Sequence, residues 1–172
     1  MASIWKHDKK YLDVDEKTND INTFKSTLLL SYSIEQDSVS QKIFFKNRKA
    51  SLLKIQEEYP SNFCFKIKVD SSILKSSSAW FQAQLNYAYL TDKFGEWNGA
   101  KIVIQQKPKN GKEKWTGVQF QRCTDKNEWT SLHFEVLATE ALQPNDEIIF
   151  YISNPSPDSI LISNMHLNLL TK

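Results

Sequence analysis

The sequence has few of the residues that mark several common protein classes. It contains four glycines, five prolines and two cysteines in 172 residues, which excludes a collagen-like repeat, a low-complexity chain and a disulfide framework. The state of Cys64 and Cys123, bridged or reduced, stays open. No apolar run reaches the ~18 residues of a membrane-spanning helix, and residues 1–6 lack the hydrophobic stretch of a signal peptide. We expect a soluble chain, either whole or excised from a larger protein.

The chain also lacks an excess of charge of one sign. Its 22 Lys and Arg residues nearly balance 20 Asp and Glu residues, for a formal net charge of +2. Proteins that are held on nucleic acid usually carry a strong basic field, so we expect no nucleic-acid partner. The length predicts one folded domain. We divide the chain into a polar, aperiodic N-terminal arm over residues 1–22 and a single domain over residues 23–172.

Catalytic and metal-binding motifs are missing as well. The glycines form neither a phosphate loop nor a dinucleotide fingerprint, and there is no Gly-Xaa-Ser-Xaa-Gly motif. The aspartates of the arm lack the spacing of a calcium-binding EF-hand loop. We therefore expect no catalytic residue, no metal and no cofactor. A pair of carboxylates for glycoside hydrolysis stays open, because such a pair is brought together in space and not along the sequence.

What the sequence does have is a repeated alternation of apolar and polar residues. Residues 62–69 (Phe63 to Val69) and 80–90 alternate with the period of two that is typical of half-buried strands, and so do 130–137 and 160–170. An Asn-Gly pair separates residues 100–106 from 115–121 and predicts an antiparallel hairpin.

These patterns predict an all-β fold, a two-sheet antiparallel β-sandwich with jelly-roll topology. One sheet is expected to contain residues 50–57, 80–90, 130–137 and 160–170, and the other residues 62–69, 100–106, 115–121 and 147–153. Residues 24–33 are expected to extend one edge.

Three stretches near the C-terminus carry a resemblance to a known group. They are WTSLHF (129–134), LQPNDEIIFYISNP (142–155) and ILISNMHL (160–167). They resemble the closing half of galactose-binding-like, jelly-roll carbohydrate-binding modules and related accessory domains of bacterial surface and glycan-processing proteins. The resemblance implies a non-catalytic domain that binds oligo- or polysaccharide at the cell surface, in the periplasm or outside the cell, attached to or associated with a larger protein. Where the group carries an acidic pair in its last strand, this chain has Ser163-Asn164, so the calcium site of that pair is in doubt.

Aromatic and amide side chains mark the candidate binding faces. If Val118 and Phe120 point into the core, then Trp115, Gln119 and Gln121 share the opposite face. Pairing within the sheet gives Gln105, Tyr151, Lys66 and Lys68 the same orientation. Sugars are bound by such faces because their C–H groups stack on aromatic rings while amides bond their hydroxyls. The candidate ligand-binding residues are Trp115, Gln119, Gln121, Tyr151, Gln105, Trp97, Trp80 and Gln84.

Several alternatives remain at this point. Trp80 and Gln84 fall on the other sheet and form a second platform, and Trp97 lies in a loop as either a rim residue or a plug over the core. Trp115 can also seal a strand end beside solvated glutamines. The chain would then be a structural or protein-interaction domain that binds no sugar. A glycan-active enzyme is the third possibility.

Overall fold

The computed structural model describes residues 25–34, 41–54, 63–71, 79–91, 99–120, 126–138, 141–155 and 158–171. The predicted arm lies outside these ranges. The strands are β1 (Lys25–Ser33), β2 (Gln41–Phe45), β3 (Arg48–Lys54), β4 (Cys64–Lys68), β5 (Ala79–Leu90), β6 (Lys101–Lys107), β7 (Lys114–Gln119), β8 (Trp129–Leu137), β9 (Glu147–Ser153) and β10 (Ser159–Thr171). Within these ranges, no helix has the length and apolar character needed to span a membrane.

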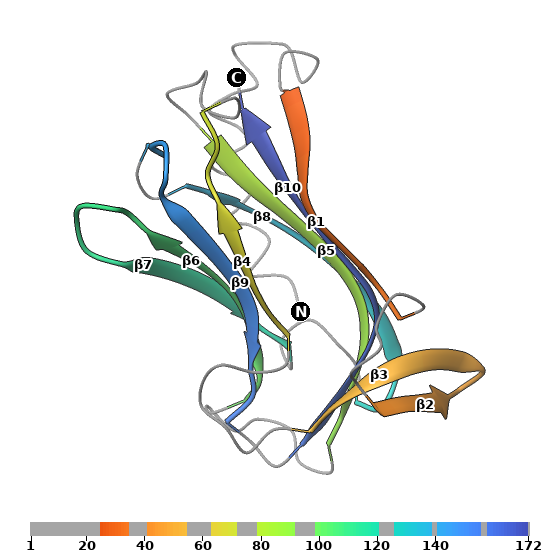
Figure 1. Cartoon of the computed structure of the whole chain (residues 1–172). Coiled ribbons are helices and arrows are strands. Elements are labelled where there is room, and N and C mark those ends of the chain that lie inside the picture. The colour runs from red at the N-terminus through yellow and green to blue at the C-terminus, as the bar shows by residue number, and fades with distance from the viewer. Residues whose placement is uncertain are drawn as a thin grey trace, which may run out of the picture.

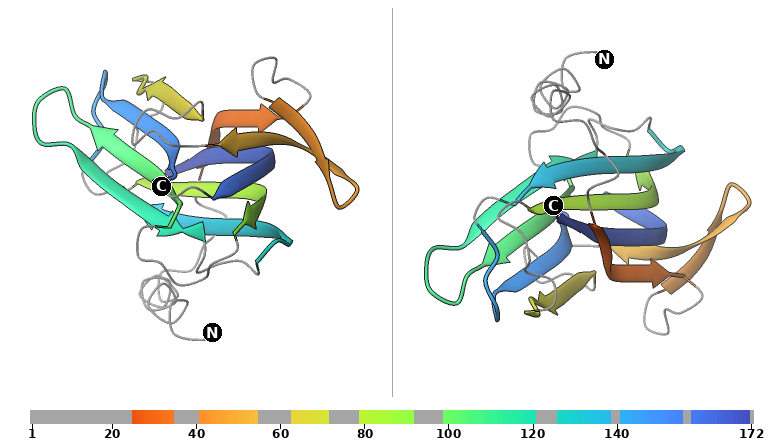
Figure 2. Two further views of the ribbon diagram at one scale, coloured as in Figure 1. Left: turned by 90° about the horizontal axis from the view of Figure 1, so that it is seen from below. Right: turned by 90° about the horizontal axis from the view of Figure 1, so that it is seen from above.

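The strands form two antiparallel sheets that face each other (Figures 1 and 2). Sheet A has the order β2-β3-β10-β5-β8, with β1 also paired to β10, and sheet B has the order β4-β9-β6-β7. From β3 onward, the chain distributes eight strands between the sheets in the order of a jelly roll. The predicted fold and the predicted membership of both sheets are therefore confirmed.

Strand β10 organises sheet A because it is long enough to hold two partners along one edge. Its residues 159–162 pair with β3, and residues 164–171 pair with β1. On its other edge it pairs with β5 over most of its length, with a register shift between Ile162 and Asn164. The extra residue at this bulge is Ser163, whose carbonyl accepts the N–H of Ile34 at 3.1 Å. The expected edge position is confirmed for residues 25–33.

The core lies between the two sheets and uses the inward residues that the alternation predicts. Phe81, Tyr87, Phe120 and Phe150 are almost fully buried there. The rings of Tyr87 and Phe120 lie 4.5 Å apart, and the Tyr87 hydroxyl donates to the Phe120 carbonyl at 3.3 Å. Burial of a phenol needs such a partner, because an unpaired polar group costs stability in an apolar core.

The β2–β3 hairpin was not predicted from the sequence. Its turn is formed by Lys46 and Asn47, which have positive φ angles of 44° and 63°. Positive φ at both central residues is the geometry of the type I′ turn that joins tightly twisted strands. Such turns usually contain glycine, and here asparagine fills the second position. Without a glycine, the sequence gives only a weak turn signal.

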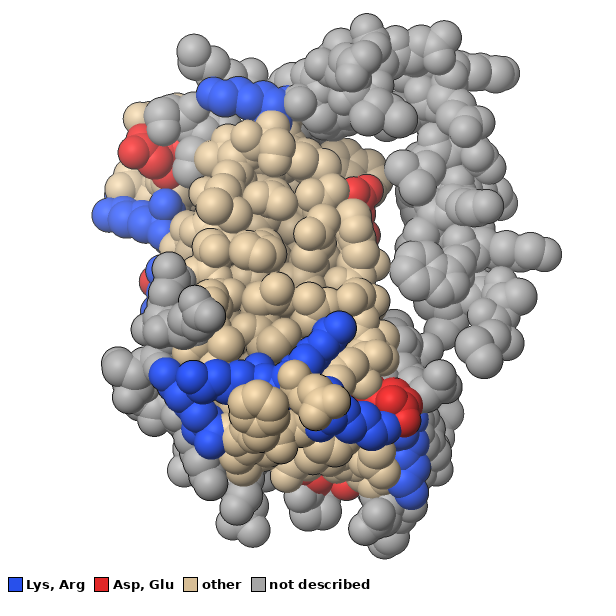
Figure 3. Space-filling view, turned by 90° about the vertical axis from the view of Figure 1, so that its right-hand side faces the viewer, with Lys and Arg blue, Asp and Glu red and all other residues tan. Residues whose placement is uncertain are grey.

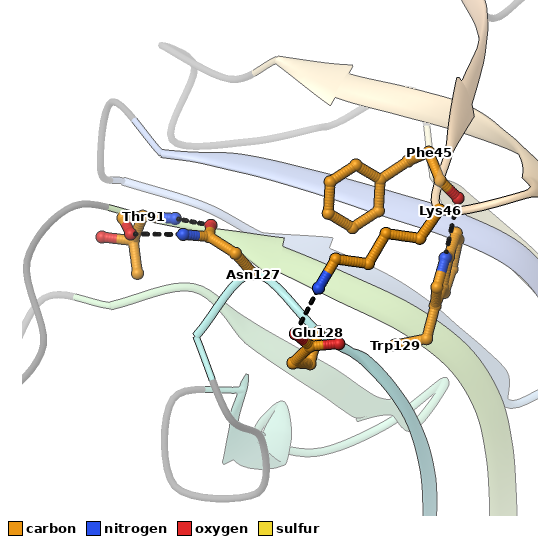
Figure 4. Close-up of polar contacts among 6 residues, drawn as sticks. All are labelled: Phe45, Lys46, Thr91, Asn127, Glu128 and Trp129. Carbon is orange, nitrogen blue, oxygen red and sulfur yellow. Dashed lines mark hydrogen bonds and ion pairs between the residues drawn. The ribbon is translucent and has the colours of Figure 1, made fainter.

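The hairpin belongs to sheet A through β3 and packs over part of the outer face of that sheet. Ala50 on β3, Ala88 on β5 and Leu161 on β10 are fully buried on this face, away from the main core. Trp129 closes this cluster, and its indole N–H donates to the Phe45 carbonyl at 3.0 Å (Figure 4). Trp129, the first residue of β8, is therefore a packing residue.

Polar contacts hold the same end of the hairpin against β8. Lys46 forms an ion pair with Glu128, and the guanidinium of Arg48 lies 5.6 Å from the centre of the Trp129 ring. Beside them, the side-chain oxygen of Asn127 accepts the N–H of Thr91 at 3.1 Å (Figure 4). The hairpin is thereby fixed to the sandwich at its turn.

The corner between β9 and β10 carries the chain from sheet B to sheet A. Asn154 is fully buried, and its side-chain amide donates to the Asp158 carbonyl at 2.7 Å. The Tyr89 hydroxyl donates to the Asp158 carboxylate at 2.6 Å, which ties the corner to β5. Pro155 has no N–H and cannot continue the β9 ladder. These contacts hold the corner in a fixed position between the two sheets.

Candidate functional site

The outer face of sheet B collects aromatic and amide side chains on neighbouring strands. The register of β6 and β7 places Trp115 directly opposite Gln105, and Gln119 opposite Lys101. These four side chains point away from the core because the residues between them, including Ile104, point into it.

Tyr151 on β9 lies at the middle of the same face. Its direct neighbours are Val103 on β6 and Cys64 on β4. Val103 and Ile149 point outward too, yet they are only 1% and 2% exposed. Both residues are buried, so the accessible part of this face consists of polar and aromatic side chains.

Trp115 is the most exposed aromatic residue on this face. It is 66% exposed, and the ammonium of Lys101 lies 5.4 Å from the centre of its ring. Gly117 lies between Trp115 and Gln119 along β7. A Cβ atom at Gly117 would lie 2.7 Å from the backbone oxygen of Ile102, so only glycine fits here without a shift. The outer side of β7 consequently has no side chain between Trp115 and Gln119.

Glu113 orients the polar groups at one end of the face. Its carboxylate accepts the side-chain amide of Gln105 at 2.7 Å and pairs with the ammonium of Lys107 at 3.3 Å. The amide of Gln105 is thereby held in one orientation beside Trp115. A polar group that is oriented before binding loses less entropy when a ligand arrives.

The pKa of Tyr151 is raised above its ordinary value of 10.0. Burial is the largest cause, because it disfavours the charged phenolate, and the negative charges of Cys64 and Glu113 add to it. The phenol therefore remains a neutral hydrogen-bonding group on this face at physiological pH.

We expect two measurable consequences of this raised pKa. Glu113→Gln should lower the pKa of Tyr151, which can be measured as the phenolate absorbance of the protein minus that of its Tyr151→Phe variant. The phenol of Tyr151 loses its proton at a lower pH in the unfolded chain than in the folded chain. The contribution of Tyr151 to the free energy of unfolding is therefore intact below about pH 10 and is lost as the pH rises further. Glu147→Gln serves as the control on the same face. An equal shift with that variant would contradict the assignment to Glu113.

The structure divides the predicted site residues between two faces. Trp115, Gln119, Gln105 and Tyr151 come together on sheet B as expected. Trp80 and Gln84 lie on the outer face of sheet A, on β5. Gln121 and Trp97 lie outside the described residues.

The outer face of sheet A differs in its chemistry. Most of it carries no charged side chain, and the blue side chains gather mainly below it, where β2 and β3 lie (Figure 3). Its polar groups bond to one another, since Asn168 donates to Gln82 at 3.2 Å and Gln82 donates to Glu135 at 2.7 Å.

Two residues of the sheet B face were missed by the sequence reasoning. Lys101 precedes Gln105 by four residues, so the same alternation could have placed it on this face. Glu113 lies in the loop between β6 and β7, where no periodicity applies, and its contact with Gln105 is visible only in the structure.

Other possible sites are weaker. A cavity of about 340 Å³ lies between the β6–β7 loop and residues 141–146. Its acidic residue, Asp146, already accepts two backbone N–H groups. Within the described ranges, no three His, Cys, Asp or Glu side chains are grouped closely enough to hold a metal ion. The aspartates of the arm lie outside those ranges.

Comparison with known proteins gives likenesses of the fold only. No family model and no curated protein matches the chain. Similar solved structures include a family 16 carbohydrate-binding module, with 13% identity over 69% of this chain and 75% of that one, at a TM-score of 0.44. The xylan-binding module CBM22-1 of Paenibacillus barcinonensis Xyn10C has 10% identity over 86% of this chain and 97% of that one, at a TM-score of 0.45. TmCBM61, solved with β-1,4-galactotriose, has 11% identity over 88% of this chain and 91% of that one, at a TM-score of 0.37.

These structures agree with the resemblance that the C-terminal stretches carry. All three TM-scores are below 0.5, so the likenesses carry no argument about what this chain binds. The assignment of the fold rests on the strand pairing itself.

Proposed function

We propose that this chain is a non-catalytic glycan-binding domain whose site is the outer face of sheet B. The observation that carries the proposal is Trp115, a large aromatic residue that is 66% exposed and lies directly opposite Gln105. A tryptophan that only sealed a strand end would be largely covered. Here the exposed ring can stack on the C–H face of a sugar, while Gln105, Gln119 and Tyr151 bond its hydroxyls.

The rigid position of these groups supports binding. They lie on β6, β7 and β9, which pair over most of their lengths. Adjacent strands are about 4.8 Å apart, so the four strands span about 14 Å, enough for a short oligosaccharide. Among the described residues of this face, no acidic side chain is buried, which favours binding over catalysis.

The experiment is a screen of the purified protein against a panel of neutral and acidic glycans, followed by calorimetry on the best ligand. We expect Trp115→Ala to weaken binding about tenfold or more, because it removes the stacking surface. Its stability should change by only about 0.5 kcal/mol, since the ring is exposed. Trp80→Ala is the matched control on the other sheet and should leave the affinity unchanged. Equal losses for both variants would contradict the site, and turnover of a glycoside would contradict the non-catalytic assignment.

One observation favours a second candidate, a protein-interaction domain. Phe44 on β2 is 73% exposed, and its cross-strand neighbour is Lys49. Residues 41–54 contain no Asp or Glu. An exposed aromatic residue among cations is typical of a contact with an acidic protein surface. If no glycan binds, a partner protein that loses affinity on Phe44→Ser but not on Trp115→Ala would identify this second function.

A further inference from the structure

The lysines on the outer face of sheet B are not equally compensated by acidic neighbours. Lys68 and Lys107 lie on either side of Glu147 in one row across β4, β9 and β6. Lys107 also pairs with Glu113 at 3.3 Å. The charges of Lys68 and Lys107 are therefore balanced by the carboxylates of Glu147 and Glu113.

Lys66 and Lys101 have different surroundings. The cross-strand neighbour of Lys66 is Ile149, and those of Lys101 are Ser153 and Gln119. Within the described part of the chain, neither lysine has a carboxylate directly opposite it across the sheet. The diagonal neighbour of Lys66 on β9 is Glu147, but that carboxylate already lies directly between Lys68 and Lys107. Lys66 and Lys101 are therefore the two lysines of this face with the least acidic compensation.

Lys66 and Lys101 lie on either side of the proposed site. Tyr151 is diagonal to both, with Lys66 two residues from its partner on β4 and Lys101 two residues from its partner on β6. Lys101 also lies 5.4 Å from the centre of the Trp115 ring. A sugar that stacks on this ring would place its substituents within reach of the Lys101 ammonium.

We propose that the ligand of this face is an acidic polysaccharide, whose carboxylate or sulfate groups pair with Lys66 and Lys101. The inference rests on the proposed function and names its ligand class. An ammonium bonded to an anionic oxygen makes a charge-assisted hydrogen bond, which is about twice as strong as a neutral one. The hydroxyls of the same sugar remain bonded by Gln105 and Gln119, so that both contacts act on one ligand.

The test compares polygalacturonate with its fully methyl-esterified form by calorimetry, with a sulfated polysaccharide as a third ligand. The ester retains the sugar ring and its hydroxyls but loses the charge. We expect the acid form to bind at least tenfold more tightly, and raised salt to reduce that advantage because screening weakens exposed charge pairs. The third ligand shows whether carboxylate or sulfate is preferred.

The lysine variants identify the residues. Lys66→Gln and Lys101→Gln should each weaken binding of the preferred acidic polymer several-fold and leave binding of the neutral ester nearly unchanged. Lys68→Gln is the matched control on β4 and should have little effect, because Glu147 is its cross-strand neighbour.

The outcomes separate this inference from the proposed function. Equal or tighter binding of the ester would overturn the acidic ligand while the glycan-binding function stands. Tighter binding of single-stranded nucleic acid than of any acidic glycan would also overturn it. If no glycan of the panel binds, both the inference and the proposed function fail.

Discussion

Trp129→Ala is expected to lower the free energy of unfolding by about 3 kcal/mol. The indole covers the buried cluster of Ala50, Ala88 and Leu161 on the outer face of sheet A, and its N–H donates to the Phe45 carbonyl at 3.0 Å. Alanine would leave a cavity under the β2–β3 hairpin and remove that bond. Because the ring is only partly buried, we place the loss at the lower end of the range for tryptophan. At about 2–4 °C per kcal/mol for a chain of this size, the melting temperature should fall by about 6–12 °C.

Two variants test the cause of this loss. Trp129→Phe keeps most of the packing and loses the donor, so we expect a loss of about 1 kcal/mol in chemical denaturation. Trp115→Ala is the same substitution at a site that is 66% exposed and should be nearly neutral for stability. If Trp129→Phe were as harmful as Trp129→Ala, the hydrogen bond and not the packing would dominate.

Asp146→Ala is expected to cost about 2–4 kcal/mol of stability. Asp146 is only 6% exposed, and its carboxylate accepts the N–H groups of Lys109 at 2.9 Å and Gln143 at 2.8 Å. Its own carbonyl accepts the N–H of Val69 at 2.8 Å, at the end of β4. One residue therefore joins the β6–β7 loop, the loop before β9 and β4. Hydrogen bonds to a charged group contribute about 1.5–3 kcal/mol each, and exposure of the neighbouring loops reduces their sum.

Asp146→Asn is the control for this prediction. Asparagine has one acceptor oxygen in place of two, so it can keep only one of the two backbone bonds and should lose about half as much stability. Equal stability of Asp146→Ala and the original protein in urea denaturation would contradict the anchoring role. Because the β6–β7 loop also carries Glu113, we expect the alanine variant to bind glycan more weakly as well.

The sandwich could be predicted because most of its strands show an apolar–polar alternation in the local sequence. In residues 80–90, alternate side chains are buried in the order that the sequence indicates, from Phe81 to Tyr89. The jelly-roll order follows from placing such segments in two Greek keys. The β2 strand was not predicted because Ile43, Phe44 and Phe45 are consecutive apolar residues. They do not show the apolar–polar alternation that identified the other strands. Phe45 packs on the outer face of sheet A while Phe44 is exposed to solvent.

The candidate site was predictable only in part. Trp115 and Gln119 share a face because they are an even number of residues apart in one strand, and Tyr151 follows from the predicted pairing of the sheet. The pairing of Trp115 with Gln105, and the contact of Glu113 with Gln105, depend on register and on a loop. Neither can be derived from periodicity.

The sequence by itself determined the strands with alternating apolar and polar residues and the buried side of each, because this alternation is a property of the local backbone. Only the tertiary structure decided which outward residues become neighbours. Residue pairing across β4, β9, β6 and β7 places Lys66 and Lys101 on either side of Tyr151, with no carboxylate directly opposite either lysine in the described sheet. That arrangement depends on contacts between segments far apart in the chain, whose register is set by packing of the whole core.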